Sequence, residues 1–445
     1  MATRPSCSPD GRGMMSPLPN RLGLLLALYL AQGIPFGVYS QAIPAILRSH
    51  DVPLSLISLS GLLALPWALK VLWAPWVDRH WWPRLGYRRS WILPMNLGMI
   101  AALAALMAFD PDSLRERDSV LLLFGLLFLV NLLSATQDIA SDGLAVRILR
   151  PAERGLGNGV QVVAHRLGII TGGGLLLYVM GTAGWATAFA GLMALSALLL
   201  IPVLLLREPP PPEAVMDGPR GHYWRIWLGF FRQPGLQGWI WVLVTYKMAD
   251  SLASAMVKPM LIDMGLSLAD MGLQVSLAGA VTTIAGALLG GLLVAPLGRR
   301  NALVLFSLLQ ALACGAFVLP ALGGGFAGLS PVTLAVMINA VEHLFGGMAT
   351  AALLAAVMDR CRPDHGGSDF TLQVGILAGF GGLFYLPAGL LAEHLGYGDF
   401  FLLALAAGLL LLWPAWRYTR EPHALAAASA SHPPAADPEA AHVRA

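Results

Sequence analysis

Charged side chains are scarce in this sequence. Asp, Glu, Lys and Arg make up 12% of the 445 residues, whereas an average soluble domain carries about 25%. Hydrophobic residues make up 57%, and the mean hydropathy is +0.68. This composition excludes an ordinary soluble globular domain and indicates an integral membrane protein.

Cysteine is also rare, and the usual enzyme signatures are missing. The three cysteines, Cys7, Cys314 and Cys361, form no CxxC pair and no zinc-like spacing with histidine, so neither a disulfide framework nor a metal site is predicted. The sequence has no Walker A lysine, no HExxH and no GxSxG. The GxGxxG match at 323–328 lies between two apolar runs, not between a strand and a helix, and is interpreted as a turn. We therefore expect no enzyme activity, no cofactor and no nucleic-acid partner.

Apolar runs of membrane-spanning length recur along the whole chain. A helix of about 20 residues crosses about 30 Å of hydrocarbon. The first run, from Leu22, is too long for a signal-peptide core and lacks a convincing cleavage site, so it is predicted to remain as a span. We predict an all-α integral membrane protein with twelve transmembrane helices at residues 22–46, 55–77, 91–109, 119–142, 159–180, 186–206, 236–258, 270–297, 302–322, 331–357, 370–393 and 399–417.

The longest internal connection, 207–237, divides these spans into six and six. A weak internal repeat supports the division: Ala74-Pro75 precedes Arg88-Arg89 in the first half, and Ala295-Pro296 precedes Arg299-Arg300 in the second. Two six-helix bundles suit a secondary transporter. The predicted organisation is a disordered tail at 1–20, a bundle at 21–206, a linker at 207–235, a second bundle at 236–420 and a disordered tail at 421–445.

The basic residues indicate an orientation. With the N-terminus inside, 21 of the 28 Lys and Arg residues fall in cytoplasmic segments, as the positive-inside rule requires. We therefore predict that both termini are cytoplasmic. Only three of the 28 are lysines, and Lys70, Lys247 and Lys258 all lie in or at the ends of predicted spans.

Two carboxylates lie within the fourth predicted span, in the stretch 137–143. An ionisable group at membrane depth is costly and is usually functional. Asp138 and Asp142 are four residues apart and share one helical face. Either could carry a proton, or Arg147, Arg150 or Arg166 could neutralise them so that they fix helix packing. The packing role suits Asp142, near the cytoplasmic end, and the carrier role suits Asp138.

Other intramembrane polar groups are candidates for contacting a solute. Lys70 has no acidic neighbour within one helical turn, so its partner must come from another helix or from a bound anion. Lys247 and Asp250 are three apart and could simply pair with each other. Arg166 could hold a carboxylate with two hydrogen bonds. Aromatic candidates could equally be packing residues. The predicted substrate contacts are Lys70, Arg166, Lys247, Asp250, Tyr39, Trp67, Tyr246 and Gln32, and the predicted proton carriers are Asp138, Glu342 and Asp142, with a packing role as the alternative for Glu342.

The stretch from Asp78-Arg79 to Arg88-Arg89 resembles the loop between the second and third spans of the major facilitator superfamily. In that family the Asp and Arg groups of this loop clasp the two halves on the cytoplasmic side. The resemblance implies a cytoplasmic gate formed by Asp78, Arg79, Arg88 and Arg89. Positive-inside charge alone would also account for the arginines.

Six further stretches resemble the AmpG-type branch of that superfamily, which holds muropeptide permeases, acetyl-coenzyme A transporters and siderophore permeases. They are Tyr29–Gly37, Lys70–Asp78, Gln137–Asp142, Glu153–Asn158, His165–Gly168 and Tyr246–Asp250. Gly367–Gln373 and Gly33–Gln41 are more similar to the siderophore permeases. The resemblance implies a proton-coupled importer of the inner membrane, embedded in the lipid bilayer, for a siderophore or iron-siderophore. We expect it to be a monomer. A muropeptide permease is the alternative, followed by an exporter of drugs or metabolites and by a membrane sensor that transports nothing.

Overall fold

The computed structural model describes residues 17–49, 59–208, 210–211, 224–267, 270–385 and 387–417. Most of both predicted tails, and residues 212–223 of the predicted linker, lie outside the described residues. Within the described ranges the regular elements are helices, and no strand is formed beyond two isolated bridges. The predicted all-α class is confirmed.

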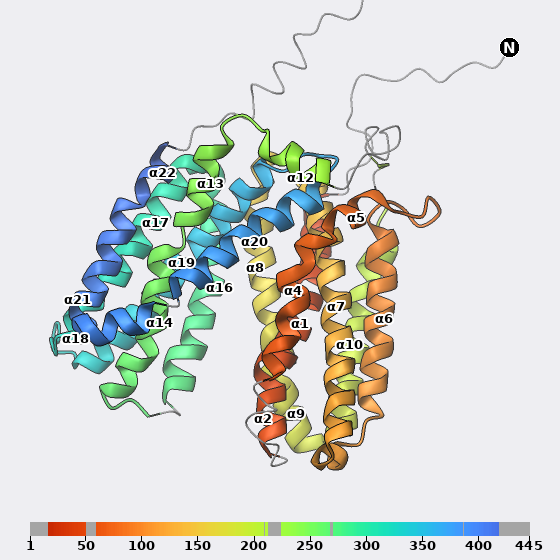
Figure 1. Ribbon diagram of the computed structural model, residues 1–445, viewed down its shortest axis with the longest axis horizontal. Helices are drawn as coiled ribbons and strands as arrows, with labels where there is room; N and C mark the ends of the chain where they lie inside the picture. Colours follow the sequence, from red (N-terminus) through yellow and green to blue (C-terminus); the bar gives the residue numbers. More distant parts are fainter. Residues whose placement is uncertain are drawn as a thin grey trace, which may run out of the picture.

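The first half of the chain forms one group of helices (Figure 1). Its elements are α1 (Leu18–Gly37), η1 (Val38–Ala42), α2 (Ile43–Ser49), η2 (Leu59–Ala64), α4 (Leu65–Leu69), η3 (Lys70–Leu72), α5 (Ala74–Arg79), α6 (Arg89–Met107), η4 (Pro111–Arg115), α7 (Arg117–Ile148), η5 (Pro151–Glu153), α8 (Arg154–Ile170), η6 (Thr171–Leu175), α9 (Leu176–Ala183) and α10 (Trp185–Leu205).

The second half forms another group, which follows the short linker helix α12 (Trp224–Phe231). Its elements are α13 (Leu236–Thr245), α14 (Met248–Asp263), η7 (Met271–Leu277), α16 (Ala278–Leu297), α17 (Arg299–Ala316), α18 (Val318–Ala321), α19 (Pro331–Asp359), α20 (Gly366–Tyr385), α21 (Ala388–Leu410) and α22 (Leu412–Arg417). Gly396, at φ 77° and ψ 159°, breaks α21 internally. Because that region is essentially restricted to glycine, Gly396 makes the turn between the eleventh and twelfth predicted spans.

Ten helices in the described part of the chain are long and apolar enough to cross a membrane. The shorter apolar helix Leu62–Leu72 and α20 account for the two remaining predicted spans. The second span is shorter and more irregular than predicted, since it passes through two 3₁₀ segments, η2 and η3. Pro66 and Pro75 lie on either side of η3, and proline interrupts the helical hydrogen-bond ladder. Lys70 lies at this irregularity.

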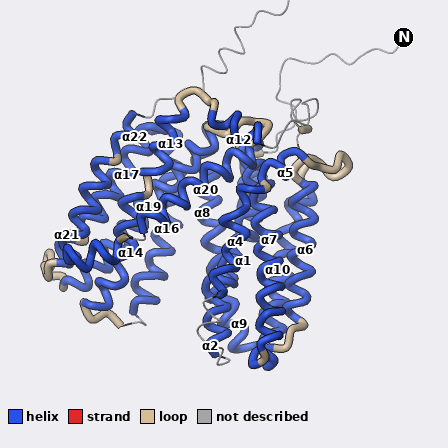
Figure 2. Tube along the Cα trace, in the orientation of Figure 1, coloured by secondary structure: helices blue, strands red, loops and turns tan. Residues whose placement is uncertain are grey.

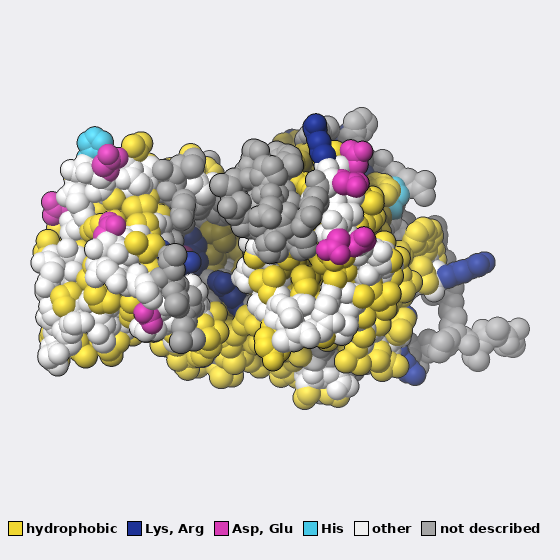
Figure 3. All heavy atoms as spheres, turned by 90° about the horizontal axis from the view of Figure 1, so that it is seen from below, with side chains coloured by type: hydrophobic (Ala, Val, Ile, Leu, Met, Phe, Trp, Pro, Cys, Tyr) yellow, Lys and Arg dark blue, Asp and Glu magenta, His cyan; other side chains and the backbone are white. Residues whose placement is uncertain are grey.

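The two groups of helices meet at one end of the molecule and separate at the other (Figures 1 and 2). We call the end with α5, α12 and α22 the closed end, and the end with α2, α9 and α18 the open end. Seen from the open end, a recess lies between the two halves, with Lys or Arg side chains in it (Figure 3). A recess reached from one side of the membrane is the geometry that alternating access requires.

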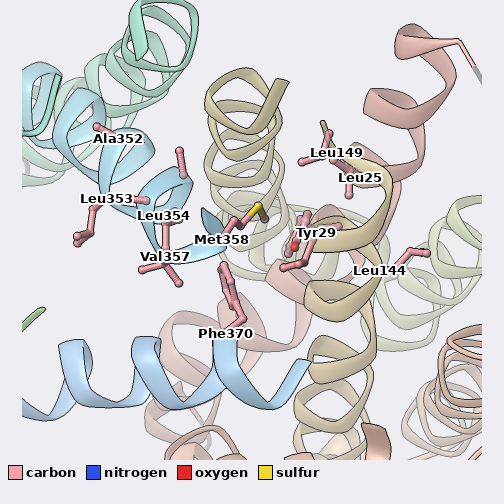
Figure 4. Close-up of a cluster of buried hydrophobic side chains, with 14 of the residues drawn as sticks. Leu25, Tyr29, Leu144, Leu149, Ala352, Leu353, Leu354, Val357, Met358 and Phe370 are labelled. Carbon is pink, nitrogen blue, oxygen red and sulfur yellow. The ribbon is translucent and has the colours of Figure 1, made fainter. Parts of the chain in front are cut away.

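At the closed end a single hydrophobic core spans both halves. The first half supplies Leu25, Tyr29 and Leu144, and the second half supplies Met358 and Phe370 (Figure 4). Phe370 and Tyr29 are 2% and 1% exposed. Burial of apolar surface contributes about 25 cal/mol per Å², so this shared core stabilises the closed end.

Glycines bring α8 of the first half against α16 of the second. A Cβ atom on Gly155 would lie 2.6 Å from the carbonyl oxygen of Gly291, and one on Gly159 would lie 2.7 Å from that of Ala287. Small residues permit such close approach between membrane helices. Within the first half the backbone approaches equally closely at Gly172, where a Cβ would lie 2.0 Å from the carbonyl oxygen of Ile34.

Gly291→Leu is expected to destabilise the contact between the halves by about 1–3 kcal/mol, the usual cost of overpacking. A leucine there would collide with the backbone of α8 at Gly155. Thermal unfolding of the purified protein in detergent measures the effect. Gly125→Leu is the matched control, because a Cβ at Gly125 meets no atom within 4 Å. Equal unfolding temperatures for the two variants would contradict a close-packed contact.

Candidate functional site

A buried ion pair lies at the centre of the first half. Lys70, in η3, pairs through Nζ with Oδ2 of Asp138 on α7. The side chains are 10% and 9% exposed. Buried charges of this kind persist only when they are paired. The partner that the sequence analysis required for Lys70 is therefore supplied by another helix.

Asp142 adjoins this pair. Its Oδ1 accepts a hydrogen bond of 2.8 Å from the hydroxyl of Tyr29 on α1, and its carboxyl group also interacts with that of Asp138. The two carboxylates are therefore bound by Lys70 and Tyr29, and not by Arg147 as the sequence analysis considered. Arg147 lies 3.6 Å from Glu208 instead. The Lys70–Asp138–Asp142 cluster lies on η3 and α7, and Tyr29 connects it to α1.

Aromatic side chains lie beside the cluster. The indole N–H of Trp67 donates to Oδ1 of Asn131 (3.0 Å), and Nζ of Lys70 lies 5.4 Å from the centre of the Trp67 ring. Phe36 packs edge-on against Tyr39 and against His165, at 5.1 and 5.7 Å between ring centres. The structure thereby brings the predicted contact Trp67 close to the charged cluster, whereas the predicted contact Tyr39 packs against Phe36.

Gln32, one turn after Tyr29 on α1, is 1% exposed. Neither its amide nitrogen nor its amide oxygen has a hydrogen-bond partner among the described residues. A buried amide that is unsatisfied in this way costs free energy. The structure therefore leaves the predicted contact Gln32 with hydrogen-bonding capacity to offer.

The second half contains a comparable polar cluster. Nζ of Lys247 lies 3.2 Å from Oδ2 of Asp250, and Asp250 interacts with the carboxyl group of Glu342 on α19. Glu342 accepts from Gln310 (2.9 Å) and lies 2.9 Å from Nδ1 of His343. Lys247, at φ −102° and ψ 9°, lies at the break between α13 and α14. Both lysines therefore lie where a span departs from α-helical geometry, as at the ion and substrate sites of many transporters.

Arg166 and Tyr246, both predicted substrate contacts, lie in different surroundings. Arg166, on α8 of the first half, is exposed and lies within the electrostatic reach of Asp250 of the second half. Tyr246 is 6% exposed, and its hydroxyl donates to the backbone carbonyl of Leu303 (3.2 Å) within the second half. Arg166 therefore has the position of a solute contact between the halves, and Tyr246 that of a packing aromatic.

A clasp at the closed end joins the halves through Asp78, at the end of α5. One carboxyl oxygen pairs with Arg88, and the other accepts from the backbone N–H (2.7 Å) and the hydroxyl of Ser368 on α20. Burial raises the pKa of Tyr87 to about 12, so its hydroxyl stays protonated and donates to the Asp78 carbonyl (2.7 Å). The Arg88 guanidinium occupies the space where a Cβ of Gly143 would lie. Asp78, Arg88 and Ser368 form what we call the first clasp.

The other two predicted gate residues have different positions. Arg89 donates to the backbone oxygens of Leu206 (3.1 Å) and Leu204 (3.3 Å), beside the end of α10 in the same half. Arg79 is half-buried at the end of α5. Arg89 therefore stabilises contacts within the first half, whereas Asp78 and Arg88 belong to the contact between the halves.

A second clasp was missed by the sequence analysis. Asp359, at the end of α19, pairs with Arg154 of the first half (2.7 Å) and with Arg299 of the second (2.6 Å). Arg299 also donates to the backbone oxygen of Pro151. The signal for it was the internal repeat, because Arg299-Arg300 echoes Arg88-Arg89. The closed end is thus held by two ionic clasps that involve both halves.

Comparisons with known proteins agree with this architecture. A family model described as Major Facilitator Superfamily matches residues 25–384. An uncharacterized protein of Haemophilus influenzae is 30% identical over 396 residues, covering 86% of this chain and 92% of the relative. The anhydromuropeptide permease of Escherichia coli K12 is 29% identical over 408 residues, covering 88% of this chain and 79% of the relative.

Solved structures match at the level of the fold. The fucose:proton symporter FucP of E. coli matches with a TM-score of 0.67 and 11% identity, over 90% of this chain and 98% of the symporter. A bacterial homologue of the iron transporter ferroportin, in its outward-facing state, matches with a TM-score of 0.65 and 17% identity, over 89% of this chain and 98% of the homologue. The two-bundle arrangement is shared with both.

Proposed function

Because this chain belongs to the Major Facilitator Superfamily, a family of secondary membrane transporters, we propose that it carries an anhydromuropeptide-like solute, a sugar linked to a short peptide. The observation that carries the proposal is the similarity along 88% of the chain to a permease named for that solute. A "Putative transporter AmpG 4" of Rickettsia conorii, 22% identical over 88% of this chain, supports it. The siderophore interpretation from the sequence finds no support among the relatives named above, and the muropeptide alternative replaces it.

The aromatic and polar side chains described above suit both parts of such a solute. Trp67, Tyr39 and Phe36 offer aromatic faces, which pack well against sugar rings and acetyl groups. Arg166 offers a fork of N–H donors that matches a carboxylate. Gln32 adds an unsatisfied amide for a hydrogen-bonding solute. A solute with sugar, amide and carboxylate groups can use all of these.

Proton coupling is the energy source that we propose. The sequence has no nucleotide-hydrolysis motif, so the energy must come from a gradient. Asp138, Asp142 and Glu342 are buried carboxyl groups at membrane depth, the residue type that carries protons in transporters. In the first half, protonation of Asp138 would release Lys70 from its ion pair. A proton and an anionic group of the solute could then be bound together.

We propose that the molecule works as a monomer in the inner membrane, with its closed end toward the cytoplasm. The arginine-rich connections at that end favour this orientation. The recess would then face the outside, and import would proceed by opening the two clasps while the halves rock about the contact of α8 with α16. Import is the direction that we propose, and the coupling gradient would set it.

Proteoliposomes test the proposal directly. With an inward proton gradient, labelled anhydromuropeptide is expected to accumulate, and a protonophore should abolish the accumulation. Right-side-out and everted vesicles distinguish import from export. A ferric siderophore given in the same assay should not accumulate. Accumulation of the siderophore alone would overturn the proposal, and absence of any flux would favour a membrane sensor.

A further inference from the structure

A separate cavity of about 180 Å³ lies within the second half. It is lined by Ala253, Ser254, Val257, Lys258, Phe317, Asn339, Glu342 and His343. These residues come from α14, from the junction of α17 with α18, and from α19. Glu342 and His343 also belong to the polar cluster of the second half described above, whereas Ser254, Val257, Lys258 and Phe317 have no role in the proposed coupling.

The positive and negative side chains around the cavity differ in whether they already have a partner. Lys258 is exposed at its edge and forms no ion pair within the described part of the chain. Glu342, by contrast, is engaged by Gln310 (2.9 Å) and His343 (2.9 Å). The charge that remains available to a ligand is therefore positive. Beside it, Ser254 and Asn339 carry polar atoms, and Val257 and Phe317 form an apolar wall.

A polar stripe connects this cavity with the space between the halves. Lys247, Asp250, Ser254 and Lys258 are spaced by three or four residues and so share one face of α14 and of the break that precedes it. Asp250 in turn lies within electrostatic reach of Arg166 in the first half. At 1.5 Å per residue, the eleven residues from Lys247 to Lys258 span about 16 Å, which is the length of about four to five extended peptide residues.

We propose that this cavity binds the terminal carboxylate of the peptide part of the solute, through Lys258. The inference rests on the proposed function, because it assigns the peptide of a muropeptide-like solute to the second half and its sugar to the aromatic side chains of the first. The polar atoms of Ser254 and Asn339 provide acceptors for peptide N–H groups. The apolar wall of Val257 and Phe317 accommodates a small side chain such as that of alanine.

The test compares three labelled solutes in the vesicle uptake assay: an anhydromuropeptide with a free terminal carboxylate, the same compound with a terminal amide, and the disaccharide without peptide. Lys258→Met is expected to raise KM about tenfold or more for the free carboxylate, the usual effect of losing a charge-assisted hydrogen bond. KM for the amide and for the disaccharide should stay unchanged. Lys258→Arg should retain most of the affinity, since it keeps the charge.

Arg225→Gln is the matched control, because Arg225 is an exposed cation on α12, far along the chain from the cavity. Ser254→Leu, which fills the cavity from an exposed position, should also weaken uptake of both peptide-bearing solutes and spare the disaccharide. If Lys258→Met changes KM equally for all three solutes, or for none, the proposal is wrong.

A binding measurement separates this proposal from the proposed function. N-acetyl-alanyl-alanine and its amide are added to the purified protein, and the rise in unfolding temperature is followed. The acid should stabilise the wild type more than the amide does, and Lys258→Met should remove the difference. That result would support the cavity even if no muropeptide were transported. Equal stabilisation of the wild type by acid and amide would overturn it, whatever the uptake assay shows.

Discussion

Asp138→Asn is expected to abolish gradient-driven uptake while solute binding persists. The substitution removes a buried carboxyl group that can exchange a proton and leaves an amide that cannot. It also leaves the Lys70 ammonium buried without its partner. Breaking one side of a buried ion pair costs about 3–5 kcal/mol, so the variant should also unfold at a lower temperature. Uptake by proteoliposomes and thermal unfolding measure the two effects independently.

The double variant Lys70→Met with Asp138→Asn separates coupling from folding. Replacing both members of a buried pair avoids the uncompensated charge, and such replacements are often neutral or stabilising. The double variant should therefore recover the unfolding temperature and still fail to accumulate solute against its gradient. Active uptake by either variant would remove Asp138 from the coupling mechanism and would direct attention to Glu342.

The stretch 137–143 shows how far the sequence could predict the site. Its two carboxylates are recognisable because they interrupt an apolar run, and their shared face follows from helical periodicity. Their partners are not recognisable, since Lys70 and Tyr29 lie 68 and 113 residues away from Asp138 and Asp142. Which helices become neighbours depends on packing between distant segments, and one sequence without an alignment carries little information on it. The irregular geometry at Lys70 could be anticipated only from the flanking prolines.

The clasps show the same limit for the gate. Resemblance to a known loop identified Asp78 and Arg88 as gate residues. It assigned the same gate role to Arg79 and Arg89. In the structure these residues have different partners. Asp78 accepts a hydrogen bond from Ser368 of the other half, whereas Arg89 donates to the backbone beside the end of α10. The ion pair of Asp359 with Arg154 could not be predicted, because each residue on its own resembles any other charged residue at the end of a span. The internal repeat was the one feature that could have led from Arg88 to Arg299 and from there to Asp359.

Asp78→Asn is expected to open the closed end. The Asp78 carboxylate is the ion-pair partner of Arg88, whose side chain is fully buried, and it also accepts two hydrogen bonds from Ser368. An amide presents one acceptor oxygen and one donor group, so it cannot satisfy both Arg88 and Ser368. A buried charge left without its partner costs about 3–5 kcal/mol, and a bias of 3 kcal/mol shifts a two-state equilibrium by roughly 150-fold.

Spin labels at Thr182 and Leu322 can follow this change, because both residues are exposed at the open end, Thr182 within α9 and Leu322 directly after α18. If the halves rock about the contact of α8 with α16, opening of the closed end in Asp78→Asn must bring the two labels closer. Arg89→Gln is the matched control, since it removes a cation from the same loop but disturbs contacts within one half. Ser368→Ala removes a single donor to Asp78 and should cause a smaller shift, worth about 1 kcal/mol. If the label distance in Asp78→Asn matches that in Arg89→Gln, the first clasp does not control the balance between the two states.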